Sequence, residues 1–308
     1  MSTSELSPVV PQLKAVRRRW GEDVIKGLLA LCALVSVATT VGIVIALFIP
    51  AIEFFREVSL WDYLTGTEWT ALFSEPSFGV LPLVAGTVLV TLVAVLVCAP
   101  LGLGAAIYLS EYANERARSI LKPTLEVLAG IPTVVFGYFA LTFVTPLLQD
   151  VGFKVGPFSA LSAALVMGIM LIPTVASVSE DAMSAVPRDL RQGAYALGST
   201  RMQVSTRIVV PAAISGIIAS FVLAISRAVG ETMIVLIAAG GQPNLTLNPT
   251  EAVQTMTAFI AATAQGDVAT GTIAYKTIFA VGATLFVMTL VMNMISIRLV
   301  RRYREIYE

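Results

Sequence analysis

The 308-residue sequence contains no histidine, only two cysteines and few charged side chains. Without histidine, the chain lacks the commonest general base and the commonest transition-metal ligand, which excludes a His-based catalytic triad. Cys32 and Cys98 lie inside apolar runs, so they indicate neither a disulfide framework nor a zinc site. Twenty basic residues balance twenty acidic ones, so the composition predicts no nucleic-acid partner.

Apolar residues are what the sequence has in excess. Hydrophobic residues make up 56% of the chain and charged residues 13%, whereas a soluble domain has about 25% charged residues. The mean hydropathy is +0.84. A protein core cannot bury this much apolar surface, so the lipid bilayer must be part of the solvent. This excludes an ordinary cytosolic enzyme, a disordered chain and a secreted disulfide scaffold.

Six apolar runs with few or no charges are long enough to cross a membrane, since a transmembrane helix needs about 20 such residues. We expect spans near residues 27–49, 80–110, 127–149, 155–179, 212–239 and 277–297. The first run is longer than the core of a signal peptide and no A-x-A site follows it, so we expect it to be retained. Residues 252–266 are too short and too rich in Thr and Gln to span, and we expect an amphipathic or re-entrant segment there. The prediction is an all-α membrane protein.

The distribution of lysine and arginine predicts the orientation of these helices. With the N-terminus inside, only Arg56, Lys154 and Lys276 fall in outside segments and only Arg227 falls within a span. The positive-inside rule therefore places both termini in the cytoplasm. We predict a cytoplasmic tail at residues 1–26, a six-helix domain at 27–300 and a second cytoplasmic tail at 301–308. The six-helix domain contains an ordered outer loop at 51–79 and a cytoplasmic loop at 180–211.

The cytoplasmic loop from Glu180 to Pro211 is the most informative segment. Its first half is predicted to be helical with a break at Pro187, and Gly198 suits the end of a helix. Ser199 or Thr200 can cap a second helix. Two short helices joined by a glycine turn would form a docking element for a partner protein, and an ordinary amphipathic loop is the alternative.

The spacing within this loop resembles the permease subunits of ABC importers. Their pattern is E-A-A-x-x-x-G, nine residues, then I-x-L-P, and this chain matches it with Gln192, Gly193, Ala194, Gly198, Ile208 and Pro211. Gln replaces the Glu of the pattern and Gly replaces its first Ala. The resemblance implies that these six residues form coupling helices, which dock on an ATP-hydrolysing subunit.

Further runs resemble one branch of that family. They are LTGTEW at 64–69, PLGLGAAIYLSEYA at 100–113, LAGIPTVVFGYF at 128–139 and SRAVGETMIV at 226–235. Together they are similar to the PstC-type membrane subunit of bacterial high-affinity phosphate importers, from about residue 25 to the C-terminus. The resemblance implies a type I ABC importer permease fold and a channel-forming role in the bacterial cytoplasmic membrane.

The resemblance also implies the partners. They are a paralogous permease that forms a heterodimer with this chain, two copies of an ATP-binding subunit, an external phosphate-binding protein and the lipid bilayer. The sequence has no Gly-Lys pair and therefore no G-x-x-x-x-G-K-[ST] phosphate-binding loop. We expect no catalytic or metal-binding residue and no cofactor on this chain, with ATP and Mg²⁺ used by the partner.

Two charges inside the fifth predicted span need an explanation, because a charge at the bilayer centre costs about 2.5–3.5 kcal/mol. Arg227 and Glu231 stand four residues apart, so one continuous helix would bring them together as a pair. A structural ion pair is one interpretation. The other is an anion pathway, in which Arg227 binds phosphate, Glu231 neutralises Arg227 when the path is empty, and Thr232 adds a hydroxyl. The resemblance assigns positions matching Arg227 and Glu231 to phosphate translocation.

Three other functions remain open at this point. They are a permease for another oxyanion such as sulfate or molybdate, a proton- or sodium-coupled carrier with Glu231 as the proton site, and a membrane scaffold or sensor that transports nothing. The loop around Gly198 favours an ATP-driven system, and the SRAVGETM run favours phosphate.

Overall fold

The computed structural model describes residues 20–302, and the predicted tails outside this range are not described. The described residues are almost entirely helical and form no β-strand. The chain divides into two units, residues 1–47 and 48–308, which are described separately. In the first unit the described part is the apolar beginning of α1 (Trp20–Glu57). All contacts reported below lie within the second unit.

Five helical segments in the described residues are long and apolar enough to cross a membrane. They are α1, α3 (Leu81–Ile107), the segment Thr133–Asp150, α7 (Ala160–Ser184) and α14 (Ile273–Arg302). A sixth span is present if the segments Arg201–Ala212 and Ile214–Val229, which meet at an angle of 71°, are counted as one. By length and composition, the described residues therefore contain five spans, or six if this bent pair is one, and the pair shares only Ala212 and Ile214–Val229 with the predicted span at 212–239.

Two predicted spans differ from the structure where glycine or proline interrupts an apolar run. The third does not start at residue 127, because α4 (Glu115–Ala129) ends there and α5 (Thr133–Phe139) begins only after Pro132. The fifth is not continuous, because it breaks at Gly230 into α11 (Ile214–Val229) and α12 (Met233–Ala238). Both breaks follow from the weak helix propensity of Gly and Pro, which apolar composition alone does not reveal.

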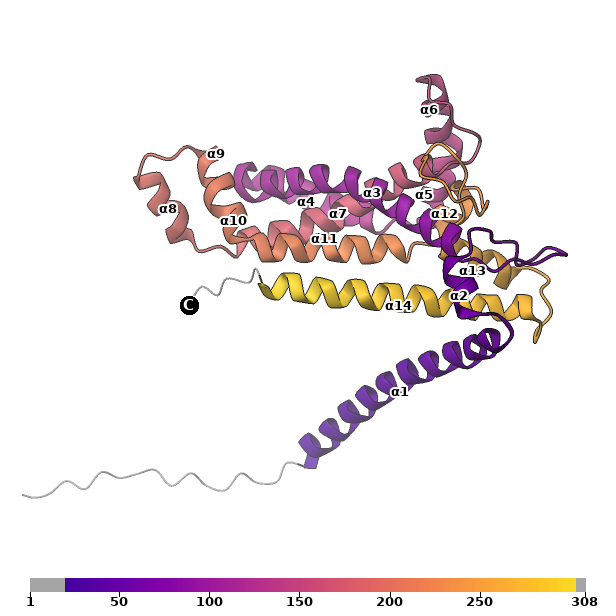
Figure 1. Cartoon of the computed structure of the whole chain (residues 1–308). Helices are drawn as coiled ribbons and strands as arrows, with labels where there is room; N and C mark the ends of the chain where they lie inside the picture. Colours follow the sequence, from indigo (N-terminus) through magenta and orange to yellow (C-terminus); the bar gives the residue numbers. More distant parts are fainter. Residues whose placement is uncertain (1–19, 303–308) are drawn as a thin grey trace, which may run out of the picture. The chain divides into compact units, whose positions relative to one another are not determined.

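The centre of the second unit is the packing of α3, α7 and α11 (Figure 1). Small residues allow this close approach, because a Cβ atom at Gly168 would lie only 2.8 Å from the Cβ of Val97. A hydrogen bond of 2.8 Å joins the hydroxyls of Ser179 and Ser220, which links α7 to α11. Cys98 is buried in this core and is not in a disulfide.

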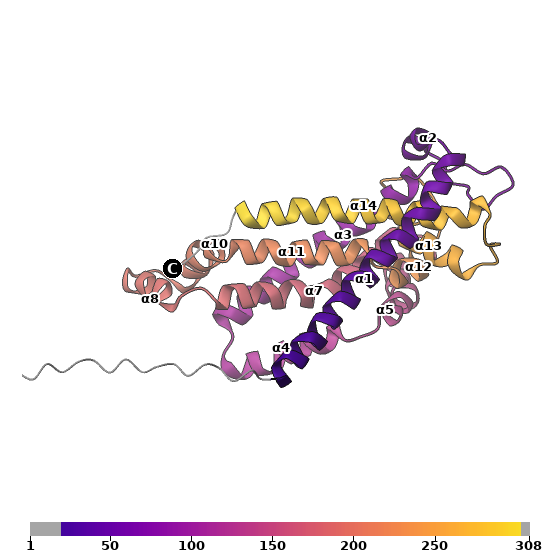
Figure 2. The same cartoon turned by 90° about the horizontal axis from the view of Figure 1, so that it is seen from below.

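The predicted outer loop is an ordered cap. It contains α2 (Leu60–Thr65) and a cluster of edge-to-face aromatic rings that includes Phe54, Tyr63, Trp69 and Phe78. The Trp69 ring also lies 5.0 Å from that of Phe259 in α13 (Met256–Gln265). This short, largely buried helix is the segment predicted not to span. Figure 2 shows α2, α12 and α13 at one end of the helix bundle. At the other end lie α8 (Arg188–Ala196) and α10 (Val210–Ala212), which belong to the loop predicted to be cytoplasmic.

Candidate functional site

The break between α11 and α12 lies inside the predicted membrane span, where every freed backbone group needs a protein partner. The amide of Glu231 donates to the carbonyl of Ala228 at 3.2 Å. The carbonyl of Glu231 accepts a hydrogen bond of 2.6 Å from the hydroxyl of Thr257 in α13. The Thr232 hydroxyl donates to the Gly230 carbonyl at 3.2 Å. The break is therefore a hydrogen-bonded part of the fold, and a residue of α13 stabilises it.

The Glu231 side chain also stabilises the break between α11 and α12. It is only 8% exposed. Its carboxylate accepts hydrogen bonds from the amides of Met233 at 3.0 Å and Ile234 at 3.4 Å, which begin α12. This is the role of a helix cap. The predicted pair of Arg227 and Glu231 is not formed, because the helix does not continue through Gly230 and no ion pair between them occurs in the described residues.

Arg227 lies in the last turn of α11, about 20 Å beyond the bend at Ala213 at 1.5 Å per residue. It is exposed on this chain, and its guanidinium donates to the Thr174 hydroxyl of α7 at 3.3 Å. The neighbouring Ser226 hydroxyl donates to Asn293 of α14 at 3.1 Å. Among the described residues Arg227 has no carboxylate partner. Its free N–H groups can therefore bind an anion, which a closed structural ion pair could not do.

The loop predicted to be cytoplasmic adopts the expected form of two short helices and a glycine turn. The first helix is α8 (Arg188–Ala196), and Gly198 follows with φ of +82°, a left-handed conformation that favours glycine. Thr200, rather than Ser199, caps the second helix through a reciprocal pair of hydrogen bonds with Gln203. That helix, α9 (Arg201–Val204), continues through a π-helical turn at Ser205–Val209 into α10 (Val210–Ala212).

The motif residues divide into an inner and an outer set. Ala194 is buried in a cluster with Val204 and Val209, and the partly buried Ile208 packs on it. Gln192, Gly193, Gly198 and Pro211 are exposed. At the tip of the loop Leu197 is 89% exposed and Met202 is 69% exposed. Large apolar side chains exposed beside polar ones are typical of a protein interaction surface.

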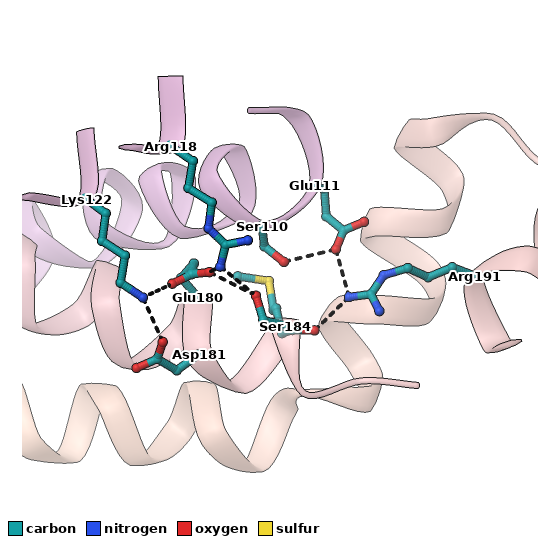
Figure 3. A network of polar contacts seen from close by, with 9 residues as sticks. Ser110, Glu111, Arg118, Lys122, Glu180, Asp181, Ser184 and Arg191 are labelled. Carbon is teal, nitrogen blue, oxygen red and sulfur yellow. Dashed lines mark hydrogen bonds and ion pairs between the residues drawn. The ribbon is translucent and has the colours of Figure 1, made fainter. Parts of the chain in front are cut away.

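Arg191 attaches α8 to the ends of the spanning helices (Figure 3). Its guanidinium donates to the carbonyls of Val186 at 2.5 Å and Met183 at 2.7 Å. It also pairs at 3.1 Å with the buried carboxylate of Glu111, in the π-helical turn Tyr108–Tyr112 that extends α3. Arg191 therefore links α8 directly to the adjacent ends of α7 and α3.

A second ionic contact ties α4 to α7. Glu180 is fully buried and accepts hydrogen bonds from Arg118, from Lys122 at 2.8 Å and from Ser184 at 2.9 Å. Lys122 also pairs with Asp181 at 3.1 Å. The hydrogen bonds to Glu180 and then to Asp181 raise the pKa of Lys122, because they stabilise its charged form. Two cations from α4 thus satisfy a carboxylate that would otherwise be buried without a partner.

Sequence reasoning did not single out these ionic contacts or Thr174 and Thr257. Glu180 directly follows the uncharged run of the fourth span, which is a signal that a charge lies at a membrane boundary. Its partners could not be found in this way, because Arg118 is 62 residues away in the chain. Arg191 and Glu111 are 80 residues apart. No helical periodicity connects residues at such separations.

Comparison with known proteins agrees with this architecture. A family model described as the inner membrane component of binding-protein-dependent transport systems matches residues 98–305. The chain is 33% identical over 293 residues to the probable ABC transporter permease protein YqgH of Bacillus subtilis, covering 94% of both chains. It is 31% identical over 251 residues to the phosphate transport system permease protein PstC of Mesorhizobium japonicum, covering 74% of this chain and 75% of the relative. A PstC of Haemophilus influenzae is 28% identical, covering 95% and 97%.

Solved structures share the fold. A bacterial alginate ABC transporter chain superimposes with a TM-score of 0.63 at 17% identity, covering 93% of this chain and 98% of that one. A chain of the MetNI methionine ABC transporter in an inward-facing conformation gives a TM-score of 0.55 at 16% identity, covering 73% and 94%. The predicted type I ABC importer permease fold is confirmed.

We expect Glu180→Gln to destabilise the protein by about 1–3 kcal/mol, because it leaves two cations facing a neutral buried amide. The matched control Asp181→Asn should cost less than about 1 kcal/mol, because the Asp181 side chain is 66% exposed. Thermal unfolding of the two purified variants in the same detergent measures the difference. Equal melting temperatures would contradict the role assigned to Glu180.

Proposed function

The chain belongs to the family of inner membrane components of binding-protein-dependent transport systems, and we propose that it is the channel-forming subunit of an ATP-driven phosphate importer. It is a multi-pass inner membrane protein of the permease class. The observation that carries the proposal is Arg227, a cation within the membrane span that has no carboxylate partner in the described residues and lies beside a break in α11. Relatives named for phosphate transport support the choice of substrate.

Arg227 has the chemistry required to bind phosphate during its passage. The planar guanidinium offers paired N–H groups that match two oxygens of a tetrahedral anion. Only one hydrogen bond, to Thr174, engages it in this chain. In this proposal phosphate passes Arg227 and is not held there permanently, because the opposite charge of Glu231 lies close by in the sequence and weakens the local positive potential.

In this proposal Glu231 and Thr232 contribute to the pathway because they lie at the break between α11 and α12. The Glu231 carboxylate is engaged by the first amides of α12, so it does not exchange with phosphate on Arg227 as the continuous helix would suggest. Its contribution is to hold α12 at an angle that leaves Arg227 uncovered. The Thr232 hydroxyl, next to the break, is the third pathway group that we propose.

The energy comes from a partner. We propose that the exposed surface around Gln192, Gly193 and Gly198 docks on an ATP-binding subunit, which uses ATP and Mg²⁺, while this chain hydrolyses nothing. The proposed assembly contains two copies of that subunit, a paralogous permease and an external phosphate-binding protein. The paralogous permease would cover Arg227, which this chain leaves exposed. Movement of the docked α8 would reach α7 and α3 through Arg191 and switch the pathway between its two sides.

The test is uptake of labelled phosphate into liposomes that contain the complex copurified with this chain, supplied with the binding protein and with ATP at the nucleotide face. We expect accumulation that requires ATP and needs no ion gradient. Accumulation of sulfate or molybdate instead of phosphate would contradict the substrate. Uptake driven by a proton or sodium gradient without ATP would contradict the importer class.

Replacing Arg227 should abolish the pathway without unfolding the protein. In the same assay we expect Arg227→Gln to reduce phosphate uptake at least tenfold, because a charge-assisted contact worth about 1.5–3 kcal/mol is lost at a transport site. Ser226→Ala, which removes a polar contact from the same helical turn, is the control and should retain most of the uptake. Copurification of the partner subunits shows whether the complex still assembles. An Arg227→Gln complex with normal uptake would exclude this residue from the pathway.

Replacing Gly198 should uncouple the partner ATPase. Its φ of +82° is strained by at least about 1–2 kcal/mol for a residue with a side chain, so Gly198→Val should distort the turn between α8 and α9. The control is Gly193→Ala, which has open space around its position and introduces the alanine of the family pattern. Copurification of the ATP-binding subunit and binding-protein-stimulated ATP hydrolysis are measured. We expect both to fall for Gly198→Val alone, and unchanged values would argue against docking at this turn.

A further inference from the structure

A polar basin opens beside α8 at the cytoplasmic end of the molecule. Its volume is about 430 Å³. Arg118, Arg188 and Arg191 line it, together with Ser110, Ser184 and Gln192. These residues come from α4, α8, the ends of α7 and the turn that extends α3. The residues lining the basin carry three positive charges and include no carboxylate.

Two of these arginines are held in place by ion pairs with buried carboxylates. Arg118 donates to Glu180, which is fully buried, and Arg191 pairs with Glu111, which is 8% exposed (Figure 3). Arg188 is exposed and forms no ion pair within the described residues. Among the lining residues and their ion-pair partners, three guanidinium groups therefore face two carboxylates. The arrangement is a cationic surface that is organised before any ligand arrives.

Gln192 also affects the charge of the basin, because it stands where the loop pattern of ABC permeases has a glutamate. The loop pattern of ABC permeases has Glu at this position, whereas this chain places an uncharged amide in the lining of the basin. A glutamate there would cancel the remaining positive charge. The departure from the pattern therefore makes the lining of the basin more favourable to an anion.

The serines indicate which anion fits. The Ser110 hydroxyl donates its proton to Glu111 at 3.0 Å, and the Ser184 hydroxyl donates to Glu180 at 2.9 Å. The Ser110 oxygen is left to act as an acceptor next to the guanidinium donors. The Ser184 oxygen already accepts a hydrogen bond of 3.4 Å from Arg118 and keeps one further lone pair. Hydrogen phosphate carries both acceptor oxygens and an O–H group at neutral pH. Sulfate carries no proton and can use only the arginines.

We propose that this basin is a cytoplasmic phosphate site that slows the transporter when its product accumulates. The proposal rests on the proposed function, because imported phosphate is delivered to this face. A phosphate bound here would bridge α8, through Arg188 and Arg191, to α4 and α7, through Arg118 and Ser184. It would therefore restrain the loop whose movement drives the switch, far from the transport site at Arg227.

The test uses the complete complex in liposomes of phosphatidylcholine alone, which removes anionic lipid headgroups as another source of phosphate. Liposomes are loaded with phosphate, sulfate or chloride on the cytoplasmic side, and initial rates of labelled phosphate uptake are measured at saturating ATP and binding protein. We expect internal phosphate to slow uptake, sulfate to act more weakly and chloride to have no effect.

Two variants locate the effect. Arg188→Gln removes the unpaired cation, and Arg188→Glu reverses its charge. Each should raise the internal phosphate concentration for half-inhibition about tenfold and leave uptake at zero internal phosphate unchanged. Arg207→Gln is the matched control, because this exposed arginine of the same loop does not line the basin. It should leave the inhibition unchanged.

The outcomes separate this proposal from the proposed function. ATP-dependent uptake that is insensitive to internal phosphate would overturn the basin and leave the importer intact. Inhibition that persists unchanged in both variants would place the effect at the pathway and also overturn the proposal. If Arg188→Gln instead releases the ATP-binding subunit, then the basin receives an acidic side chain of that partner, and the phosphate site is wrong.

Discussion

Within a bilayer no water is available to hydrogen-bond a backbone group that a helix leaves free, and this constraint shapes the chain. It explains why the apolar runs form long helices, and why the break at Gly230 occurs only where other groups replace the lost hydrogen bonds. Thr257 satisfies the carbonyl of Glu231, and the Glu231 carboxylate satisfies the first amides of α12. The short helix α13 is thus more than a loop element, because it makes the break possible.

The same physics acts on the charges. Inside the span, backbone amides donate hydrogen bonds to the Glu231 carboxylate, which does not pair with Arg227, so Arg227 keeps its donors for a ligand. Near the end of α7 the carboxylate of Glu180 is neutralised by two cationic side chains of α4. A buried charge requires a partner in both places, and the choice of partner decides what the group can do. Because Glu231 is bound by backbone amides, Arg227 remains available to a ligand. The salt bridges of Glu180, in contrast, hold α4 and α7 together.

Helix α7 connects these two regions. Its Thr174 accepts the hydrogen bond from Arg227, and its Glu180 and Met183 carbonyl hold α4 and α8. Close packing against α3 at Gly168 and the hydrogen bond between Ser179 and Ser220 leave little room for α7 to move independently. In the proposed mechanism, movement of α8 is therefore passed through this closely packed core to the level of Arg227. The proposed phosphate basin lies on this same connection, between α8 and the end of α7.

Much of this protein follows from its sequence alone, because hydropathy, the positive-inside rule and the local chemistry of turns each act over short stretches. They predicted most of the apolar spans, the ordered segment at 51–79, a non-spanning segment at 252–266 and the glycine turn at Gly198. Tertiary structure decided what depends on residues far apart in the chain. The sequence predicted a pair between Arg227 and Glu231 from their spacing, but that spacing holds only in an unbroken helix. Thr257, 26 residues from Glu231, stabilises the break and so separates the two charges. Likewise the contacts of Glu180 with α4 and of Arg191 with Glu111 exist only after folding, because helices pack by the shape of their faces and not by their order in the sequence.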